Sequence, residues 1–253
     1  MTEDTFISHL VELRDRLLRA LVAVLVVFLC LFPFASELYD LIASPMMRAL
    51  PAGTKMIATG VVTPFLIPVK VALMTAFAIA LPYVLYQAWA FVAPGLYAHE
   101  KRLVVPLVVA STLLFFAGMA FCYFFVFGVV FEFVYKIAPA SISVAPDIEN
   151  YLSFVLTLFL AFGVTFEVPI VVLILARMGV VTIEQLVNIR PYFIVGSFVI
   201  AAIVTPPDVI SQLLLAIPMC LLYEVGIIAA RLFGKPRASG AVEPIEGEPG
   251  SGS

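Results

Sequence analysis

Long runs of apolar residues separated by short polar segments make up most of this chain. The charge-free runs lie at residues 20–36, 71–98, 103–131, 151–166, 168–176, 191–207 and 209–223, and Glu167 alone divides the fourth from the fifth. A helix needs about 20 predominantly apolar residues to cross some 30 Å of hydrocarbon. Joined across Glu167, these runs predict an all-α, polytopic membrane protein with six transmembrane helices.

We place a single transmembrane domain over residues 1–236. Its spans are predicted at about 20–37, 64–92, 103–135, 150–177, 192–205 and 209–228. Residues 5–19 are expected to form an amphipathic helix at the membrane interface, because Leu10, Leu13 and Leu17 share one helical face. The tail over residues 237–253 is rich in Gly, Pro, Ser and Glu and is expected to be disordered.

The last two spans are predicted to form a short helical hairpin, because only Thr205-Pro206-Pro207-Asp208 separates their apolar runs. At 1.5 Å per residue, a helix of about fifteen residues covers roughly 22 Å, which is less than the hydrocarbon thickness. We therefore expect a thinner bilayer beside this hairpin. The competing topology has five spans, with these two runs merged into a re-entrant pair.

Proline is frequent inside the predicted spans. It occurs at Pro33, Pro68, Pro82, Pro169 and Pro218. Each proline removes a backbone donor and tends to kink a helix. The long helices are therefore expected to form a curved, kinked bundle instead of a straight one.

Composition and charge agree with a membrane protein. Hydrophobic residues make up 63% of the chain and charged residues 12%, against about 45–50% and 25% in soluble domains. With six spans, ten Lys and Arg residues fall on the side shared by the two termini and three on the other side. The positive-inside rule then places both termini in the cytoplasm. The five-span topology would leave the terminal basic cluster outside.

Several function classes lack their residues here. The net charge of −3 and the scattered basic residues give no nucleic-acid surface, and GxxxxGK[ST], GxSxG and HExxH motifs are absent. The three cysteines lie singly in apolar runs, which argues against a disulfide framework or a zinc site. We expect no metal, no cofactor and no catalytic residues.

Glu167 is the most informative residue, because it is the one charge in a long apolar run. A carboxylate at such a depth costs about 2.5–3.5 kcal/mol on insertion scales and normally faces a protein interior or a wet cavity. The residue is either a functional site or a buried acid that is hydrogen-bonded for structure. Physical arguments alone do not separate the two.

Polar residues at the ends of the spans each have a modest alternative explanation. Glu12 can form an i,i+4 pair with Arg16, and Glu100 can be a first-turn acid facing a helix dipole. Asp208 is suited to cap the last helix. Gln212, one turn deeper, can bond across helices, and Pro45 in the outer loop signals only a turn.

Five segments together resemble the TatC family, the multispanning core subunit of the twin-arginine protein translocase, in its proteobacterial form. They read HLVELRDRL, IASPMM, YQAWAFVAPGLYAHEKR, TFEVP and TPPDVISQ. Each segment alone is a weak signal, but the combination is specific. The resemblance covers nearly all of residues 5–235.

This resemblance implies a receptor in the bacterial inner membrane that binds paired-arginine signal peptides of folded cargo. It implies assembly with TatA-type and TatB-type single-span partners into an oligomeric complex in the lipid bilayer, with export driven by the proton-motive force. The residues implied for signal binding are Glu12, Arg14, Phe91, Pro94, Leu96, Tyr97 and Glu100. Those implied for other roles are Glu167 as an intramembrane polar site, Asp208 and Gln212 for partner contact, and Pro45 for the structure of the outer loop.

The assignment of carboxylates to the paired arginines agrees with the chemistry of arginine. A planar guanidinium offers two parallel donors that match the two oxygens of a carboxylate, whereas the ammonium group of lysine does not. The competing hypothesis is a proton-coupled small-molecule transporter that uses Glu167 as its carrier site. It predicts a second, repeat-related polar site, and the sequence contains no repeated half. An intramembrane enzyme would need a nucleophile and base at suitable spacing, which the chain does not offer.

Overall fold

The computed structural model describes residues 3–49, 57–92, 101–137, 147–205 and 208–233. Within these ranges the regular elements are helices, and one isolated bridge pairs Ile57 with Asp147. Six helical segments are long and apolar enough to cross a membrane. They are Ile7–Ala43, Thr63–Val92, Val105–Phe133, Ile148–Arg177, Ile183–Val204 and Val209–Phe233. The predicted all-α fold with six spans is therefore confirmed.

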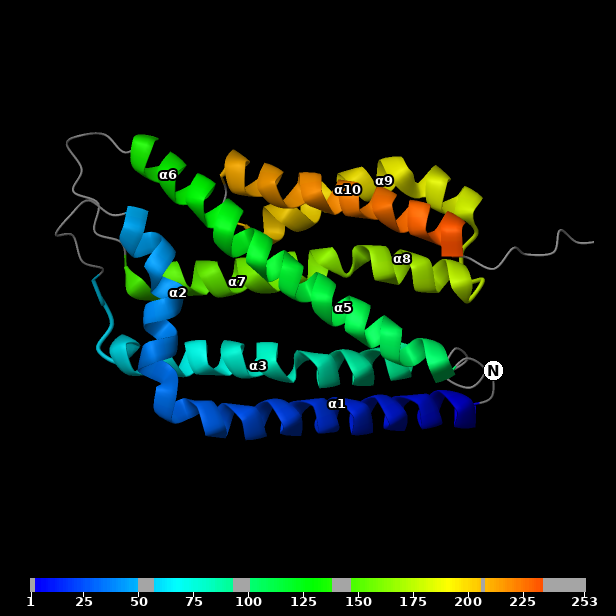
Figure 1. Ribbon diagram of the computed structural model, residues 1–253, viewed down its shortest axis with the longest axis horizontal. Coiled ribbons are helices and arrows are strands. Elements are labelled where there is room, and N and C mark those ends of the chain that lie inside the picture. Colours follow the sequence, from blue (N-terminus) through cyan, green and yellow to red (C-terminus); the bar gives the residue numbers. More distant parts are fainter. Residues whose placement is uncertain (1–2, 50–56, 93–100, 138–146, 206–207, 234–253) are drawn as a thin grey trace, which may run out of the picture.

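The first span is bent by a proline. Helix α1 (Glu3–Leu31) passes through a short 3-10 turn, η1 (Phe32–Phe34), into α2 (Ala35–Ala49), which leaves at a steep angle (Figure 1). Pro33 lies in that turn. No Pro or Gly occurs between residues 3 and 31, so within the described residues the amphipathic stretch is continuous with the rest of α1.

The remaining helices follow with few interruptions. They are α3 (Thr63–Val92), α5 (Lys101–Phe121), the π-helical segment η2 (Cys122–Val126), α6 (Phe127–Ile137), α7 (Ile148–Phe166), α8 (Val168–Arg177), α9 (Ile183–Val204) and α10 (Val209–Phe233). α5, η2 and α6 form one long diagonal rod (Figure 1). Pro68 and Pro82 lie inside α3 without ending it, whereas Pro169 stands at the break between α7 and α8.

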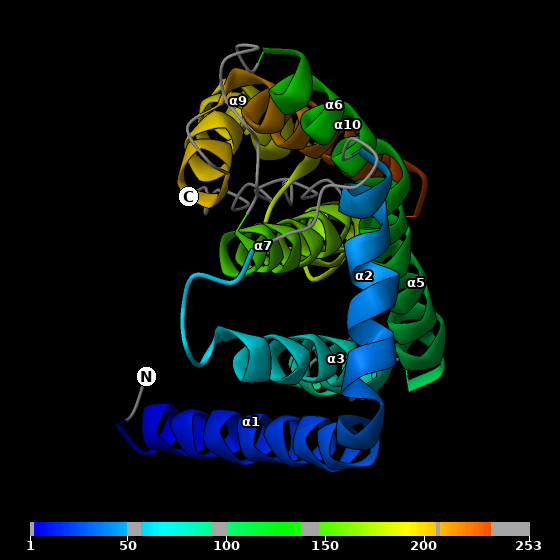
Figure 2. The same cartoon turned by 90° about the vertical axis from the view of Figure 1, so that its left-hand side faces the viewer.

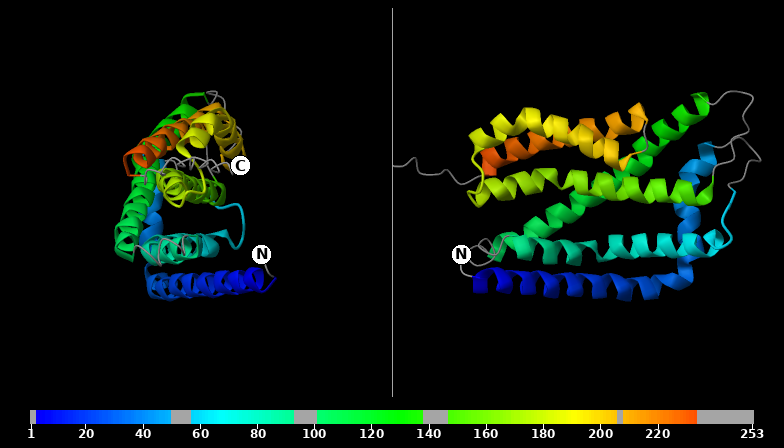
Figure 3. Two further views of the ribbon diagram at one scale, coloured as in Figure 1. Left: turned by 90° about the vertical axis from the view of Figure 1, so that its right-hand side faces the viewer. Right: turned by 180° about the vertical axis from the view of Figure 1, so that it is seen from behind.

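The helices form a curved wall. Viewed end on, α1, α3 and α7 form a row, α9 and α10 lie beyond it, and α2 and α5 stand along one side (Figure 2). The start of α1 and the end of α10 lie at the same end of the molecule, and the view from behind agrees (Figure 3). An even number of spans requires this arrangement.

The largest apolar core is aromatic and lies where α6, α7 and α10 meet. Phe127 and Phe162 are fully buried there, and the rings of Phe127 and Phe159 lie 5.2 Å apart. Where α5 crosses α7, Gly118 lies against the carbonyl group of Phe162, and the ring of Phe115 packs against Gly163. Two glycines thus allow the backbones of the crossing helices to approach closely.

The final hairpin is longer than its charge-free runs suggest. α9 has 22 residues and α10 has 25, which at 1.5 Å per residue gives about 33 and 37 Å. The helices continue through polar residues, because Arg190 of α9 pairs with Glu224 of α10 at 2.6 Å. These are the shortest of the six spanning segments, but they are long enough to cross the hydrocarbon. The predicted thinning of the bilayer beside them rested on shorter helices, and the observed lengths remove that reason.

Candidate functional site

One turn near the start of α1 carries a carboxylate that already holds a guanidinium. Oε1 of Glu12 accepts hydrogen bonds from Nε and Nη2 of Arg16, at 2.9 and 2.6 Å. The Glu12 side chain is 40% exposed and that of Arg16 is 24% exposed. The predicted i,i+4 pair is thus present, and its carboxylate lies at the surface, where a further cation can reach it.

The end of α3 covers this turn of α1. The imidazole of His9 stacks on the ring of Phe91, with centroids 4.3 Å apart and planes 18° from parallel. Nη1 of Arg16 donates a long hydrogen bond of 3.5 Å to Oε1 of Gln87, a buried residue that is 5% exposed. The structure therefore places Glu12 and Phe91 on facing turns of two helices. His9 and Gln87 join them, although the sequence analysis did not assign either residue to the site.

The other residues assigned to signal binding are less well placed. Arg14 bonds to its neighbour Asp15 through Nε and Nη2, at 3.0 and 2.9 Å, and its side chain is 67% exposed. It therefore lies at the surface without engaging Glu12. The residues Pro94, Leu96, Tyr97 and Glu100 lie outside the described part of the chain.

Glu167 occupies the break between α7 and α8. The break arises because Pro169 has no N–H, so the carbonyl of Thr165, four residues earlier, loses its usual helical donor. The carbonyl of Glu167 accepts from the N–H groups of Ile170 and Val171, both at 3.0 Å, and these bonds begin α8. The side chain is 8% exposed, and among the described residues neither carboxyl oxygen has a hydrogen-bond partner. A buried polar group without a partner is costly, so the structure contains an unfilled polar position at membrane depth.

Two helices bring a polar pair toward Glu167. The hydroxyl of Ser111 on α5 is close enough to interact with this carboxyl, although it stops short of hydrogen-bond geometry. The same hydroxyl accepts a hydrogen bond of 2.9 Å from Nε1 of Trp89 on α3. The Trp89 bond leaves the proton of Ser111 available for Glu167. The sequence alone gives no sign of this pair, because its members come from separate spans.

Asp208 and Gln212 organise the α9–α10 hairpin. Oδ1 of Asp208 accepts from the N–H of Ser211 at 2.7 Å, which is the capping contact predicted from the sequence. Nε2 of Gln212 donates to the carbonyl of Phe198 on α9 at 3.2 Å. The amide therefore bonds across two spanning helices, as expected for such a residue.

The predicted position of Pro45 in an outer loop is wrong, because Pro45 lies inside helix α2.

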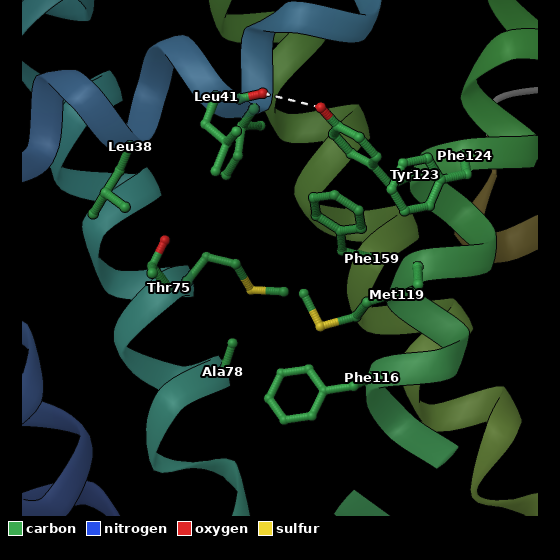
Figure 4. Close-up of a pocket in the computed structure, with 12 residues that line it drawn as sticks. Leu38, Leu41, Thr75, Ala78, Phe116, Met119, Tyr123, Phe124 and Phe159 are labelled. Atoms are coloured by element: carbon green, nitrogen blue, oxygen red, sulfur yellow. Dashed lines mark hydrogen bonds between the residues drawn. The ribbon is translucent and has the colours of Figure 1, made fainter. Parts of the chain in front are cut away.

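A pocket of about 390 Å³ lies between α2, α3, the α5–η2 rod and α7, and its wall is almost entirely apolar (Figure 4). At its edge the hydroxyl of Tyr123 donates to the carbonyl of Leu41 at 3.3 Å. A second pocket of about 510 Å³ lies between α1, α3 and α7, and Lys70 is the charged residue in its lining.

A polar cluster, which the sequence analysis did not identify, links the starts of α3 and α7. Nζ of Lys70 bonds to Oε1 of Glu149 at 3.1 Å, and the hydroxyl of Thr63 donates to Oε2 of the same carboxylate at 2.9 Å. The hydroxyl and N–H of Thr59 both donate to Oδ2 of Asp147, at 2.6 and 3.2 Å. The position of Lys70 inside a span was the one sequence signal for this cluster.

The carboxyl of Asp147 gives the cluster an acid-sensitive contact. The hydrogen bond from the Thr59 hydroxyl, followed by one from the N–H of Asn150, lowers the pKa of Asp147 below its usual 3.8. A lowered folded pKa contributes stability that is present above the unfolded pKa and is lost as the pH falls through the folded pKa. Thr59→Val is therefore expected to lower the thermal midpoint of the purified protein at pH 7, with the difference from the unaltered protein shrinking below about pH 4. An equal difference at pH 7 and pH 3 would contradict this account.

Comparisons with known proteins agree with this arrangement. The family model of the Sec-independent protein translocase protein TatC matches residues 8–218. The TatC of Escherichia coli K12 is 52% identical over 238 residues, which cover 93% of this chain and 92% of that protein. The TatC of Halothiobacillus neapolitanus is 53% identical over 243 residues, covering 96% of this chain and 66% of the relative.

Solved structures give the same result. A crystal structure of the twin arginine translocase receptor TatC aligns with a TM-score of 0.78 at 42% identity, covering 88% of this chain and 98% of that one. A second crystal structure of the receptor, in DDM, gives a TM-score of 0.79 at 41% identity. The family resemblance, the six-helix fold and the multi-pass membrane character are thereby confirmed. The family is a translocase component and not an enzyme, as predicted, and nothing favours the small-molecule transporter.

Proposed function

Since the chain belongs to the TatC family of Sec-independent protein translocases, we propose that it is the receptor and core subunit of a twin-arginine translocase. In this role it binds the paired-arginine signal peptides of folded proteins at one membrane face. It assembles with TatA-type and TatB-type single-span proteins into an oligomeric complex, and the proton-motive force drives export. The basic residues near both ends of the chain favour a cytoplasmic location for the two termini.

One contact carries the binding part of the proposal. Glu12 holds a guanidinium fork at 2.6 and 2.9 Å while remaining partly exposed. This contact supports the proposal, because it shows that the Glu12 carboxylate is accessible to a guanidinium, whose planar set of donors lysine does not offer. Glu100 supplies the second carboxylate, and Arg14, Phe91, Pro94, Leu96 and Tyr97 complete the recognition surface.

The apolar part of the signal peptide is assigned to the curved wall. The pocket between α1, α3 and α7 has an apolar lining that includes Leu21, Phe77 and Leu160. A signal helix seated there exchanges lipid contacts for protein contacts. Glu167 does not line this pocket but lies about two turns beyond Leu160 on the same span. It is assigned as a polar position for a segment inserted further along the wall, because its carboxyl oxygens have no partner within the described chain.

Site-specific photocrosslinking tests this function directly. A photoreactive residue at position 92, an exposed position next to Phe91 at the end of α3, is expected to capture a paired-arginine signal peptide. The same probe at position 195, on the exposed face of α9, serves as the control. Equal capture of peptides with two arginines and peptides with two glutamines would refute receptor function.

Asp208 and Gln212 are assigned to partner contact, and this makes a prediction of its own. Gln212→Ala removes the bond to Phe198 and is expected to lower crosslinking to the single-span partners several-fold, while affinity for the signal peptide changes less than twofold. Asp208→Asn is the informative companion variant, because asparagine caps a helix as well as aspartate does. It removes the charge and preserves the cap.

Crosslinking yields measured side by side for partner and signal decide the assignment. If Gln212→Ala weakens signal binding more than partner contact, the two roles have been assigned the wrong way round. If Asp208→Asn leaves partner contact intact while Asp208→Ala destroys it, the cap matters and the charge does not.

A further inference from the structure

The carboxylate assigned to the incoming signal is already occupied within the chain. Both Nε and Nη2 of Arg16 donate to Oε1 of Glu12, so an internal guanidinium occupies one of the two carboxylate oxygens that a bidentate contact from the signal needs. By contrast, Arg14 bonds to Asp15, and no contact joins Arg19 to Glu12 among the described residues. Of the three arginines on this stretch of α1, Arg16 is the one that occupies the site.

We propose that Arg16 is an internal competitor that sets the affinity of the site for signal peptides. The proposal rests on the function proposed above. An arginine of the signal can bind Glu12 fully only when Arg16 has released it. When only a fraction of the molecules is competent to bind, the apparent affinity falls by that fraction.

This competition lowers the affinity for every signal peptide without changing the selectivity for arginine. The internal pair must open by the same amount whatever cation replaces it, so signals with arginine and signals with lysine lose affinity by the same factor. The preference for arginine then comes from the guanidinium geometry itself. Arg16 therefore lowers the affinity for both peptides by the same factor and leaves the ratio of their affinities unchanged. At a given peptide concentration, a weakly binding signal then fails to bind while a strongly binding one still binds.

Gln87 provides a second position for the displaced guanidinium. Its Oε1 lies 3.5 Å from Nη1 of Arg16 while the pair with Glu12 is intact. A neutral amide oxygen is a weaker acceptor than a carboxylate, so Arg16 favours Glu12 when no signal is present. Once displaced, Arg16 still has a partner on α3, and its charge is not left unpaired at a partly buried position.

Arg16→Gln tests the proposal in the full-length protein reconstituted in lipid nanodiscs. A fluorescently labelled paired-arginine signal peptide is titrated and its anisotropy recorded. Ion pairs of this spacing are modest, so we expect binding to tighten about two- to fivefold. A peptide with one arginine changed to lysine is expected to tighten by the same factor. Arg19→Gln removes the same charge three residues further along α1 and corrects for long-range electrostatics.

A double variant completes the test. In a Glu12→Gln background, Arg16→Gln is expected to have no effect beyond that of Arg19→Gln, because there is no carboxylate left to compete for. If Glu12→Gln weakens binding but Arg16→Gln leaves it unchanged or weaker, internal competition is overturned and the proposed function stands. If Glu12→Gln itself leaves binding unchanged, the proposed assignment of Glu12 fails before Arg16 is considered.

Discussion

Replacing both Glu12 and Glu100 by alanine is expected to lower the affinity for a paired-arginine signal peptide by about a hundredfold. Each carboxylate is proposed to hold one guanidinium, and a hydrogen bond to a charged group contributes about 1.5–3 kcal/mol. Glu12 is 40% exposed, so solvent screening reduces its share to about 1.4 kcal/mol, or tenfold. Glu12→Ala also leaves Arg16 without its carboxylate, and the freed cation repels the incoming arginines. Anisotropy titration of the single and double variants measures the loss.

Glu184 offers a matched control for this experiment. It is an exposed carboxylate in the first turn of α9, and in the proposed topology it lies at the same membrane face as Glu12. Glu184→Ala is expected to change affinity less than twofold, because it loses the same charge outside the recognition surface. If the Glu12 and Glu100 double variant holds the signal as firmly as the Glu184 variant does, recognition does not depend on these carboxylates.

The number of spans was predictable from the sequence because the bilayer leaves few alternatives. A backbone inside hydrocarbon must satisfy its own hydrogen bonds, and a charge-free run of sufficient length has no other stable form. The ends of the spans were harder to predict. A charge-free run ends at the first charged residue. The helices α9 and α10 extend past that residue because Arg190 and Glu224 neutralise each other between them.

Local pairs could also be predicted, because helical spacing fixes them. The Glu12–Arg16 pair and the Asp208 cap follow from residues within one turn. The contacts of His9 with Phe91 and of Trp89 with Ser111 join different spans. Such contacts depend on how each helix is rotated about its axis, and an apolar span carries little periodic signal for that rotation.

At the end of α3, the rotation of the helix about its axis determines which neighbouring helix each side chain contacts. Gln87 and Phe91, one turn apart, contact α1 at the recognition turn. Trp89, between them in sequence, points to α5 and packs with Ile170 and Ile174 of α8. A single helical segment therefore touches both the surface carboxylate site and the helices that enclose Glu167.

The second large effect is expected at the crossing of α5 and α7, where we expect Gly118→Ala to destabilise the protein by about 1–3 kcal/mol, the usual range for overpacking. A methyl group at position 118 would meet the carbonyl of Phe162, which is helix backbone and cannot move aside, and the ring of Phe166 at 3.0 Å. Gly163→Ala is expected to act similarly, because its methyl group would enter the buried ring of Phe115. Thermal unfolding of the purified variants, followed by loss of monodisperse protein, measures the change.

Gly196→Ala separates packing from helix propensity in this test. Gly196 lies inside α9, and a methyl group there would meet no atom within 4 Å. Alanine favours a helix over glycine by about 0.8–1.0 kcal/mol, so this variant is expected to be neutral or slightly more stable. The sign of the effect therefore differs between the crossing and the open helix face. If Gly118→Ala and Gly196→Ala shift the thermal midpoint in the same direction and by the same amount, the close approach of α5 and α7 does not constrain the fold.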